Sequence, residues 1–284
     1  MRRLAIFLAL LPLITAAQVR VASPATAQRE CKYDSTENTT KQPECLIGQD
    51  LFVIPLEKDV YIQSYYSFGR SIETTNGSTV MKGKIDPSCV RGHTFHVTDK
   101  IDDTFQGLSK SGRYYLQLVD KETNDTIYYR HGLFPFIVIG YKEKMESTYG
   151  GKLFVYRWYG LRNFDTGESI ENCHKSTWTF KEVIAVPNET EPRYFFTNSE
   201  GVGTVVSDFN EFILKSDISS FKKKYGAAMV DLALDGEVKV GMASDLVKIA
   251  KGNPDKINSA SYGQQWVYKN VYIYIKNGKV TGWN

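Results

Sequence analysis

Short apolar runs, each bounded by Gly, Asn, Asp or Pro, follow one another from Cys31 to about Ser207. Examples are the runs at 51–54, 114–119 and 134–139. Runs of this length between turn-forming residues are typical of β-strands. The run at 134–139 is almost entirely apolar, so we expect a strand with both faces buried. The pattern predicts a mainly β region that occupies more than half of the chain.

A short motif occurs twice in this region, at 45–53 and 89–97. It reads Cys, apolar, any residue, Gly, two polar residues, apolar, any residue, Val. A third copy at 150–155 keeps the glycine and the apolar run but lacks the cysteine. We interpret each copy as a tight turn on glycine that leads into a strand. The core-facing residues are then Leu51 and Val53 in the first copy, and Phe95 and Val97 in the second.

The uneven spacing of the three copies argues against a solenoid and favours separate small barrels. The copies resemble bacterial Src-homology-three-like barrels, which open with a Gly-x-x-apolar strand. We therefore expect three β modules, at 28–88, 89–147 and 148–207.

The character of the sequence changes at about Asp208. Apolar residues recur at helical spacing in Ile218, Phe221, Tyr225, Ala228 and Leu232, which predicts a helix that Gly236 can end. A second, shorter helix is predicted from Ser244 to Lys251. Strands are then predicted at 265–268 and 271–275, and Asn277-Gly278 is the favoured hairpin dipeptide before a final strand. The range 208–284 is thus predicted to be an α+β module, with two helices on an antiparallel sheet.

The last part of this module resembles the BamE-like (SmpA/OmlA) domain. The resemblance covers about 237–284 and rests on Gly241-Met242, Gly252-Asn253-Pro254, Gln265 to Tyr268 and Tyr272 to Val280. It implies two helices packed on a small antiparallel sheet, related to the β-lactamase-inhibitor-protein fold, and a binding or scaffolding module without catalytic residues. Ala243 stands where the family usually has Thr or Ser, and the lipid-accepting cysteine of its outer-membrane members is missing.

The amino terminus has the features of a secretory signal peptide. Arg2 and Arg3 precede an apolar segment from Leu4 to Ile14, and small residues follow as far as Ala27. The apolar segment is about half of the ~20 residues that a spanning helix needs. We expect a leader at 1–27 that is cleaved, no lipid anchor, and a periplasmic or secreted protein that does not span a membrane.

The chain contains four cysteines, Cys31, Cys45, Cys89 and Cys173. In an oxidising compartment an even number of cysteines favours disulfides. Cys31–Cys45 and Cys89–Cys173 are the expected pairs, and a bridge between Cys45 and Cys89 is an alternative. The short loop closed by Cys31–Cys45 is worth about 3 kcal/mol in the loop-entropy model.

Charge does not point to nucleic acid. The formal net charge is +3, and Arg2, Arg3 and Arg20 all lie in the expected leader at 1–27, so the remaining chain has a net charge of zero. Nucleic-acid binding needs a clustered basic face, and the only basic triplet, Lys222–Lys224, fits a solvated helix face. We therefore expect no nucleic-acid partner.

Two groups of residues are of the types that carry out chemistry. Cys89, His93 and His96 are of the types that bind zinc, but residues at odd separation in a strand point to opposite faces. Cys173 and His174 could form a thiolate–imidazole pair, yet adjacent residues in an extended chain also point apart. Phosphate-loop, Gly-x-Ser-x-Gly and His-Glu-x-x-His motifs do not occur. We expect no enzyme, no metal and no cofactor.

Aromatic residues are the remaining candidates for binding, since the chain contains 18 Tyr, 15 Phe and 4 Trp. In a strand, one member of an adjacent pair must face outward. Such pairs give six possible partner-binding residues: Tyr65, Tyr66, Tyr128, Tyr129, Trp158 and Tyr159. The sequence as a whole predicts a non-catalytic exported protein that binds another envelope or extracellular macromolecule. A cell-wall or glycan-binding protein and an inhibitor of a secreted enzyme are the alternatives.

Overall fold

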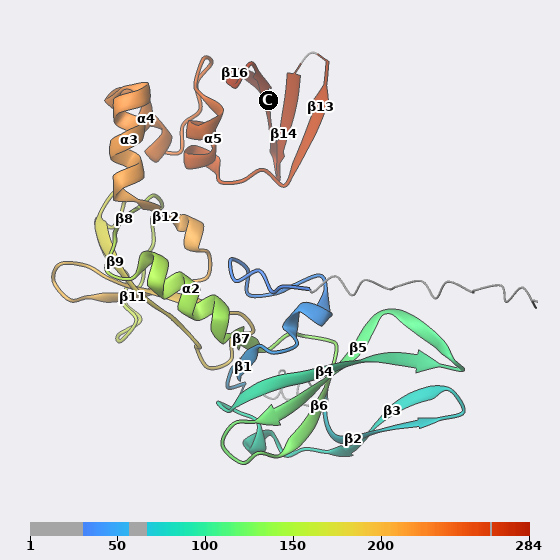
Figure 1. Ribbon diagram of the computed structural model, residues 1–284. Helices are drawn as coiled ribbons and strands as arrows, with labels where there is room; N and C mark the ends of the chain where they lie inside the picture. Colours follow the sequence, from blue (N-terminus) through green and yellow to red (C-terminus); the bar gives the residue numbers. More distant parts are fainter. Residues whose placement is uncertain (1–30, 57–66, 262) are drawn as a thin grey trace, which may run out of the picture. The chain divides into compact units, whose positions relative to one another are not determined.

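The computed structural model describes residues 31–56, 67–261 and 263–284, and the predicted leader at 1–27 lies outside them. Lys32–Asn284 form one compact unit. The described residues contain three antiparallel sheets and have helices mainly in the C-terminal part (Figure 1). The prediction of a mainly β, multi-domain fold is confirmed.

The first sheet has seven strands: β1 (Asp50–Val53), β2 (Phe68–Thr75), β3 (Ser78–Lys84), β4 (Thr94–Phe105), β5 (Leu108–Asp120), β6 (Thr126–Arg130) and β7 (Phe136–Val138). Their order across the sheet is β3-β2-β6-β5-β4-β1-β7. Leu51 pairs with both Phe95 and Val138, and Val97 pairs with Leu118. Paired residues lie on the same face, and all five are buried, so this face forms the core.

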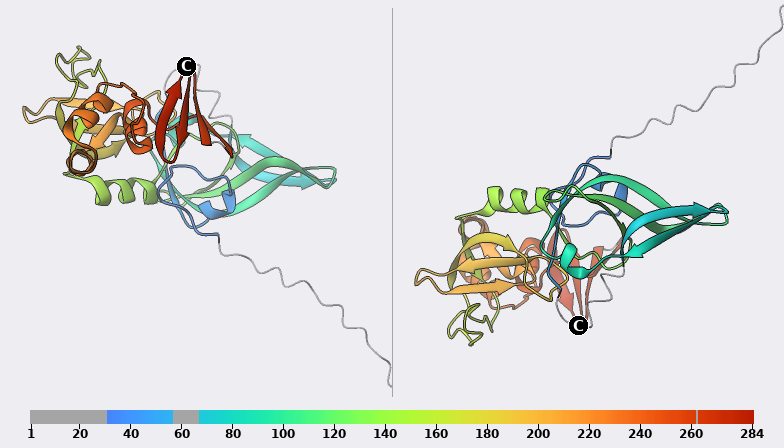
Figure 2. Two further views of the ribbon diagram at one scale, coloured as in Figure 1. Left: turned by 90° about the horizontal axis from the view of Figure 1, so that it is seen from above. Right: turned by 90° about the horizontal axis from the view of Figure 1, so that it is seen from below.

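This sheet does not close into a barrel, which differs from the barrel-like repeats expected. Its edge strand β3 meets β4 only near the tips of the β2–β3 and β4–β5 hairpins, which lie side by side in both views of Figure 2. There Gly107 N donates to Gly77 O (2.8 Å), and the hydroxyls of Thr79 and Thr104 are 2.7 Å apart. Strands from the ranges 28–88 and 89–147 therefore share one open sheet.

The two cysteine-containing copies of the repeat lie against each other, because β1 pairs antiparallel with β4. Gly48 N donates to Val97 O (2.8 Å), and the equivalent Gly92 N donates to Val53 O (3.0 Å). Both glycines have positive φ, 83° and 71°. These reciprocal bonds give the pair of copies an approximate two-fold symmetry.

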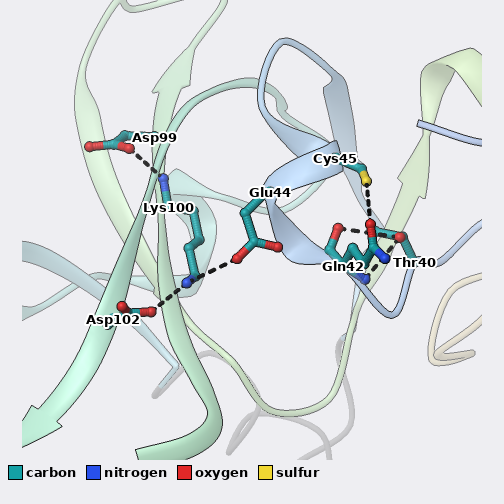
Figure 3. Close-up of polar contacts among 7 residues, drawn as sticks. All are labelled: Thr40, Gln42, Glu44, Cys45, Asp99, Lys100 and Asp102. Carbon is teal, nitrogen blue, oxygen red and sulfur yellow. Dashed lines mark hydrogen bonds and ion pairs between the residues drawn. The ribbon is translucent and has the colours of Figure 1, made fainter. Parts of the chain in front are cut away.

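A 3-10 turn precedes the glycine in each copy: η1 (Pro43–Leu46) and η2 (Pro87–Cys89). The first turn is anchored by Lys100 of β4, whose ammonium lies 3.1 Å from Glu44 Oε1 and also contacts Asp102 (Figure 3). The Lys100 side chain is only 17% exposed, so this bridge is partly shielded from water.

The second sheet has five strands: β8 (Leu153–Tyr156), β9 (Thr177–Ile184), β10 (Arg193–Thr197), β11 (Gly203–Val206) and β12 (Phe212–Leu214), in the order β11-β10-β9-β8-β12. Helix α2 (Ile139–Tyr149) contacts β9, and a 3-10 turn, η3 (Phe209–Glu211), precedes β12. The core is aromatic, and the rings of Phe196 and Phe212 stack with centroids 3.8 Å apart. The run at 134–139, predicted as one strand, is divided between β7 and the start of α2.

The C-terminal module contains α3 (Lys215–Tyr225), α4 (Ala227–Leu234), α5 (Ser244–Lys251) and a four-stranded sheet of β13 (Lys256–Ala260), β14 (Gly263–Tyr268), β15 (Val271–Lys276) and β16 (Lys279–Trp283). Helices α3 and α4 replace the first of the two predicted helices, because Gly226, with φ of 85°, breaks it. The apolar side chains of Trp266, Ile273 and Val280 share a core with residues of the helices.

Within the described ranges, the structure contains no helix that is both long and apolar enough to cross a membrane.

Candidate functional site

The four cysteines fall into two classes. Cys31 and Cys45 are disulfide-bonded, as expected. Cys89 is an exposed free thiol and Cys173 is a buried free thiol. The predicted Cys89–Cys173 bridge is therefore wrong, and so is the alternative bridge between Cys45 and Cys89. The reason is positional: Cys89 lies in η2 beside the first sheet, whereas Cys173 precedes β9 of the second sheet.

The six candidate aromatic residues occupy different environments. Tyr65 and Tyr66 lie outside the described residues. Tyr128 is half-buried in β6. Its neighbour Tyr129 is fully buried, and its hydroxyl donates to Leu133 O. Tyr129 thus belongs to the core.

Trp158 and Tyr159 lie together at a polar pocket of about 610 Å³. The residues that line it come from the end of β8, from η3 and from the end of α5: Tyr156, Arg157, Trp158, Tyr159, Asp208, Asn210, Glu211, Lys251, Gly252 and Asn253. Tyr159 is 73% exposed and Trp158 is half-buried. A volume of this size is within the range of small-ligand sites, ~300–1,000 Å³. This set of residues is the candidate functional site.

Arg157 is the buried centre of the site. Its Nη1 donates to the carbonyls of Lys248 (3.1 Å) and Ile249 (2.8 Å), in the last turn of α5. A cation at a helix C-terminus is favourable. The guanidinium also lies 4.6 Å from the Trp158 ring centroid, while its buried Nε has no partner among the described residues. Arg157 is thus held by the last turn of α5 and packs its guanidinium against the Trp158 ring.

Two carboxyl groups of η3 complete the polar side of the pocket. Asp208 caps the turn by accepting from Asn210 N (2.9 Å). Burial, followed by the negative charge of Asp208, raises the pKa of the Glu211 carboxyl above its usual value. Burial also raises the pKa of the Tyr156 hydroxyl, with a further contribution from Glu211. The site thus offers hydroxyl and carboxyl groups of different acidity within one pocket.

Gly252 is required for this arrangement. Its φ is +84°, and a Cβ at this position would lie 3.3 Å from Arg157 Nη2. Tyr268 OH donates to Gly252 O (3.1 Å) and holds the loop after α5 in place. A larger residue would strain the backbone and press on the guanidinium.

Neither ring nitrogen of His174 is hydrogen-bonded to Cys173 in the part of the chain that the structure describes. His174 Nε2 lies 3.1 Å from Asp235 Oδ1, and its Nδ1 is buried without a partner among the residues described. The imidazole stacks beneath the Tyr159 ring, with centroids 4.3 Å apart. His174 therefore supports the aromatic wall of the pocket.

The alternative zinc ligands are also engaged elsewhere. His93 Nδ1 lies 2.7 Å from Asp120 Oδ2, and His96 Nδ1 lies 2.8 Å from Asp50 Oδ1. In the described part of the chain, no group of three or more His, Cys, Asp or Glu side chains could hold a metal ion.

No family model, curated protein or solved structure matches this chain.

Sequence reasoning identified the aromatic wall of the site but not its polar side. The run from Tyr156 to Tyr159 places Arg157 among aromatic residues, a signal that could have marked it. Glu211 and Lys251 are distant in sequence, and only the fold brings them to the pocket.

Proposed function

We propose that this chain is an exported, non-catalytic binding protein, and that the pocket around Trp158 and Tyr159 holds part of a glycan on an envelope or extracellular macromolecule. The observation that carries the proposal is the exposed Tyr159 ring next to Trp158, at a pocket with carboxyl and guanidinium groups.

Sugar chemistry suits this combination. A sugar ring has an apolar face of C–H groups, which packs on the flat faces of Tyr and Trp. Its hydroxyls donate to carboxylates such as Glu211 and accept from donors such as Arg157 and Lys251. Arg157 and His174 already hold the two aromatic rings, so little order has to be gained on binding.

Export is supported by the leader that the sequence predicts at 1–27 and by the Cys31–Cys45 disulfide, a bond that persists in oxidising compartments. The non-catalytic proposal is supported by the sequence, in which no Gly-x-Ser-x-Gly or His-Glu-x-x-His motif occurs.

The test is titration of the purified chain with a panel of cell-wall and cell-surface oligosaccharides, followed by calorimetry. Tyr159→Ala should weaken binding at least tenfold, about 1.4 kcal/mol, without a change in the melting transition, since the ring is 73% exposed. Tyr272→Ala is the matched control, because Tyr272 is 43% exposed on β15 and should not matter.

Two results would contradict the proposal. Equal affinity of Tyr159→Ala and the parent would show that the pocket is not the site. Cleavage of an oligosaccharide that Glu211→Gln abolishes would show an enzyme instead.

The C-terminal sheet gives a second candidate, a protein partner. Across its outer face, Asn258 Nδ2 donates to Gln265 Oε1 (3.0 Å) and Gln265 Nε2 to Tyr274 OH (3.4 Å), next to the exposed Tyr272. The BamE-like resemblance of 237–284 implies a scaffolding role and favours this face. Loss of a protein partner by Tyr272→Ala, but not by Tyr159→Ala, would select this candidate.

A further inference from the structure

The three sheets have six edge strands: β3, β7, β11, β12, β13 and β16. An uncovered edge presents N–H and C=O groups that can pair with a further strand. On β7 these groups are occupied, because the Asn38 side chain accepts from Val138 N (2.9 Å) and donates to Phe136 O (2.8 Å). On β16, Val280 N donates to Met242 O (2.8 Å). Both edges are therefore covered by other parts of the chain.

Three further edges are covered, short or interrupted. On β11, Gly203 O accepts from Phe164 N (2.9 Å). Strand β12 has only three residues and runs directly into α3. Strand β3 contains Lys82 and a glycine with positive φ, Gly83 (70°). Lysines and local distortions of this kind are typical of edges that do not accept another strand.

Strand β13 differs from the other five edges. Its five residues, Lys256–Ala260, are all exposed. It pairs with β14 alone (Figure 1), and in the described ranges its residues make no backbone hydrogen bond on the side away from β14. Its only charged residue is Lys256, at the start of the strand. The edge is thus open to a second strand.

The sequence of β13 is complementary to itself. In an antiparallel pair of two copies centred on Asn258, Asn258 lies opposite Asn258 of the second copy. Ile257 then lies opposite Ser259, and Lys256 lies opposite Ala260. At a rise of ~3.4 Å per residue the two lysines are ~14 Å apart along the strands, which exceeds the Debye length of ~10 Å at 0.1 M salt. No like charges face each other in this register.

The outer face of the C-terminal sheet supports the same register. Asn258 Nδ2 donates to Gln265 Oε1 (3.0 Å), and Gln265 Nε2 donates to Tyr274 OH (3.4 Å). An asparagine amide has two donor hydrogens and an oxygen with two lone pairs. Asn258 can therefore keep its bond to Gln265 and also pair with Asn258 of the second copy, which continues this row of hydrogen bonds across the edge.

The face that packs on the helices also favours pairing. Ile257 is 45% exposed, although its β14 neighbour Trp266 is only 4% exposed. In the register centred on Asn258, the Ile257 side chains of the two copies occupy diagonal positions on this face and are close enough to bury each other. The apolar surface that one chain leaves exposed is thus covered by the second chain.

We infer that two copies of this chain associate through β13, antiparallel about Asn258, so that their C-terminal sheets form one continuous sheet. A pair of five-residue strands buries less than the ~1,200 Å² of a stable interface, so the dimer is weak and reversible. The inference is independent of the glycan site, since no residue of β13 lines that pocket.

The experiment is sedimentation velocity of the purified chain from about 1 μM to about 1 mM, a range that covers the affinities of small interfaces. The parent should shift from monomer to dimer as its concentration rises. Asn258→Lys and Asn258→Asp should each weaken association at least tenfold, because each places like charges directly opposite one another. An equimolar mixture of the two variants should restore association, because opposite charges then face each other.

Thr281→Lys is the matched control, because Thr281 is exposed on β16, the edge that Met242 covers. This variant should associate as the parent does, and melting transitions confirm that every variant is folded. The inference is overturned if Asn258→Lys associates as the parent does, or if the mixture fails to restore association. A parent that stays monomeric up to about 1 mM also overturns it, and β13 would then be left to an extended segment of a different protein.

Discussion

The turn that carries Cys45 and the turn that carries Cys89 have the same backbone but different chemistry. Both are 3-10 turns followed by a glycine with positive φ and a core strand. The N–H of each glycine donates to the last residue of the other copy, Val97 or Val53. Cys45 is buried and disulfide-bonded, whereas Cys89 is exposed and free.

This difference separates two contributions to the repeated motif. The glycine and the apolar residues build the turn and the strand, since they have the same role in both copies. The disulfide is not needed for that geometry, because η2, which contains the free Cys89, forms without one. The disulfide at Cys45 instead anchors the segment that begins at Cys31. Lys100 anchors η1 in a similar way, through its ion pair with Glu44.

The largest expected effect concerns the two core positions that the symmetry equates. Leu51 and Phe95 pair directly and are 0% and 1% exposed. Leu51→Ala and Phe95→Ala should each lower the free energy of unfolding by about 3–5 kcal/mol, because each leaves a cavity at the same place in the core. Urea unfolding measures both values.

Thr98→Ala, at an exposed position of β4, is the control and should change stability by less than about 0.5 kcal/mol. A small loss for one of the two core variants, with a large loss for the other, would contradict the structural equivalence of the copies.

The cysteines should separate the copies most clearly. Cys45→Ser should cost about 3 kcal/mol, the loop-entropy value for a bridge of this length, whereas Cys89→Ser should cost less than about 0.5 kcal/mol. The comparison is made by urea unfolding without reductant.

Reductant provides the internal control, since the reduced parent should match Cys45→Ser. In addition, a maleimide reagent should label Cys89 in the folded chain but not the buried Cys173. Equal losses for both serine variants would contradict the assignment of the bridge to the first copy alone.

The inward faces of both copies were predictable from sequence, but their pairing was not. The alternation of Leu51 and Val53, and of Phe95 and Val97, predicts which side chains enter the core, and all four are buried. Such a pattern does not specify the neighbouring strand, so the separate modules were expected where one sheet forms.

Helix α2 was missed for a related reason. Only Tyr141 and Met145 of this helix are buried, so its sequence lacks the continuous apolar stripe by which helices are predicted. In the candidate site, Trp158 and Tyr159 could be predicted because they are adjacent aromatic residues. Glu211 lines the same pocket only because of the tertiary fold, which no local sequence pattern predicts.

The glycines should behave alike in the two copies. Gly48 and Gly92 have φ of 83° and 71°, and an added Cβ would meet no atom within 4 Å at either position. Gly48→Ala and Gly92→Ala should therefore cost only the left-handed backbone term, about 1–2 kcal/mol each. Thermal or urea unfolding measures the loss.

Asparagine tolerates this backbone region better than alanine, so Gly48→Asn should lose less than Gly48→Ala. Gly282→Ala is the control, because Gly282 also has open space but no positive φ, and it should not destabilise. A loss at Gly282 as large as at Gly48 would point to packing instead of backbone conformation.

The smallest expected effect on stability concerns Asp50 of the first copy. The equivalent position in the second copy is Thr94. Asp50 Oδ1 lies 2.8 Å from His96 Nδ1, and Oδ2 lies 2.5 Å from Lys121 Nζ. Burial alone would raise the pKa of the Asp50 carboxyl, but the hydrogen bonds and charges of Lys121 and His96 hold it below the usual 3.8.

A carboxyl with a lowered folded pKa stabilises the fold above its unfolded pKa, and that contribution is lost as the pH falls below about 3.8. Asp50→Asn should therefore be less stable than the parent near neutral pH by up to about 1 kcal/mol, since the pair is partly exposed. The difference should shrink as the pH falls, and urea unfolding at a series of pH values measures it.

Thr94→Ser, which has no titrating group, should follow the parent at every pH. A constant difference between Asp50→Asn and the parent across the acid range would show that Asp50 acts through packing, and the charged bridge would no longer distinguish the first copy from the second.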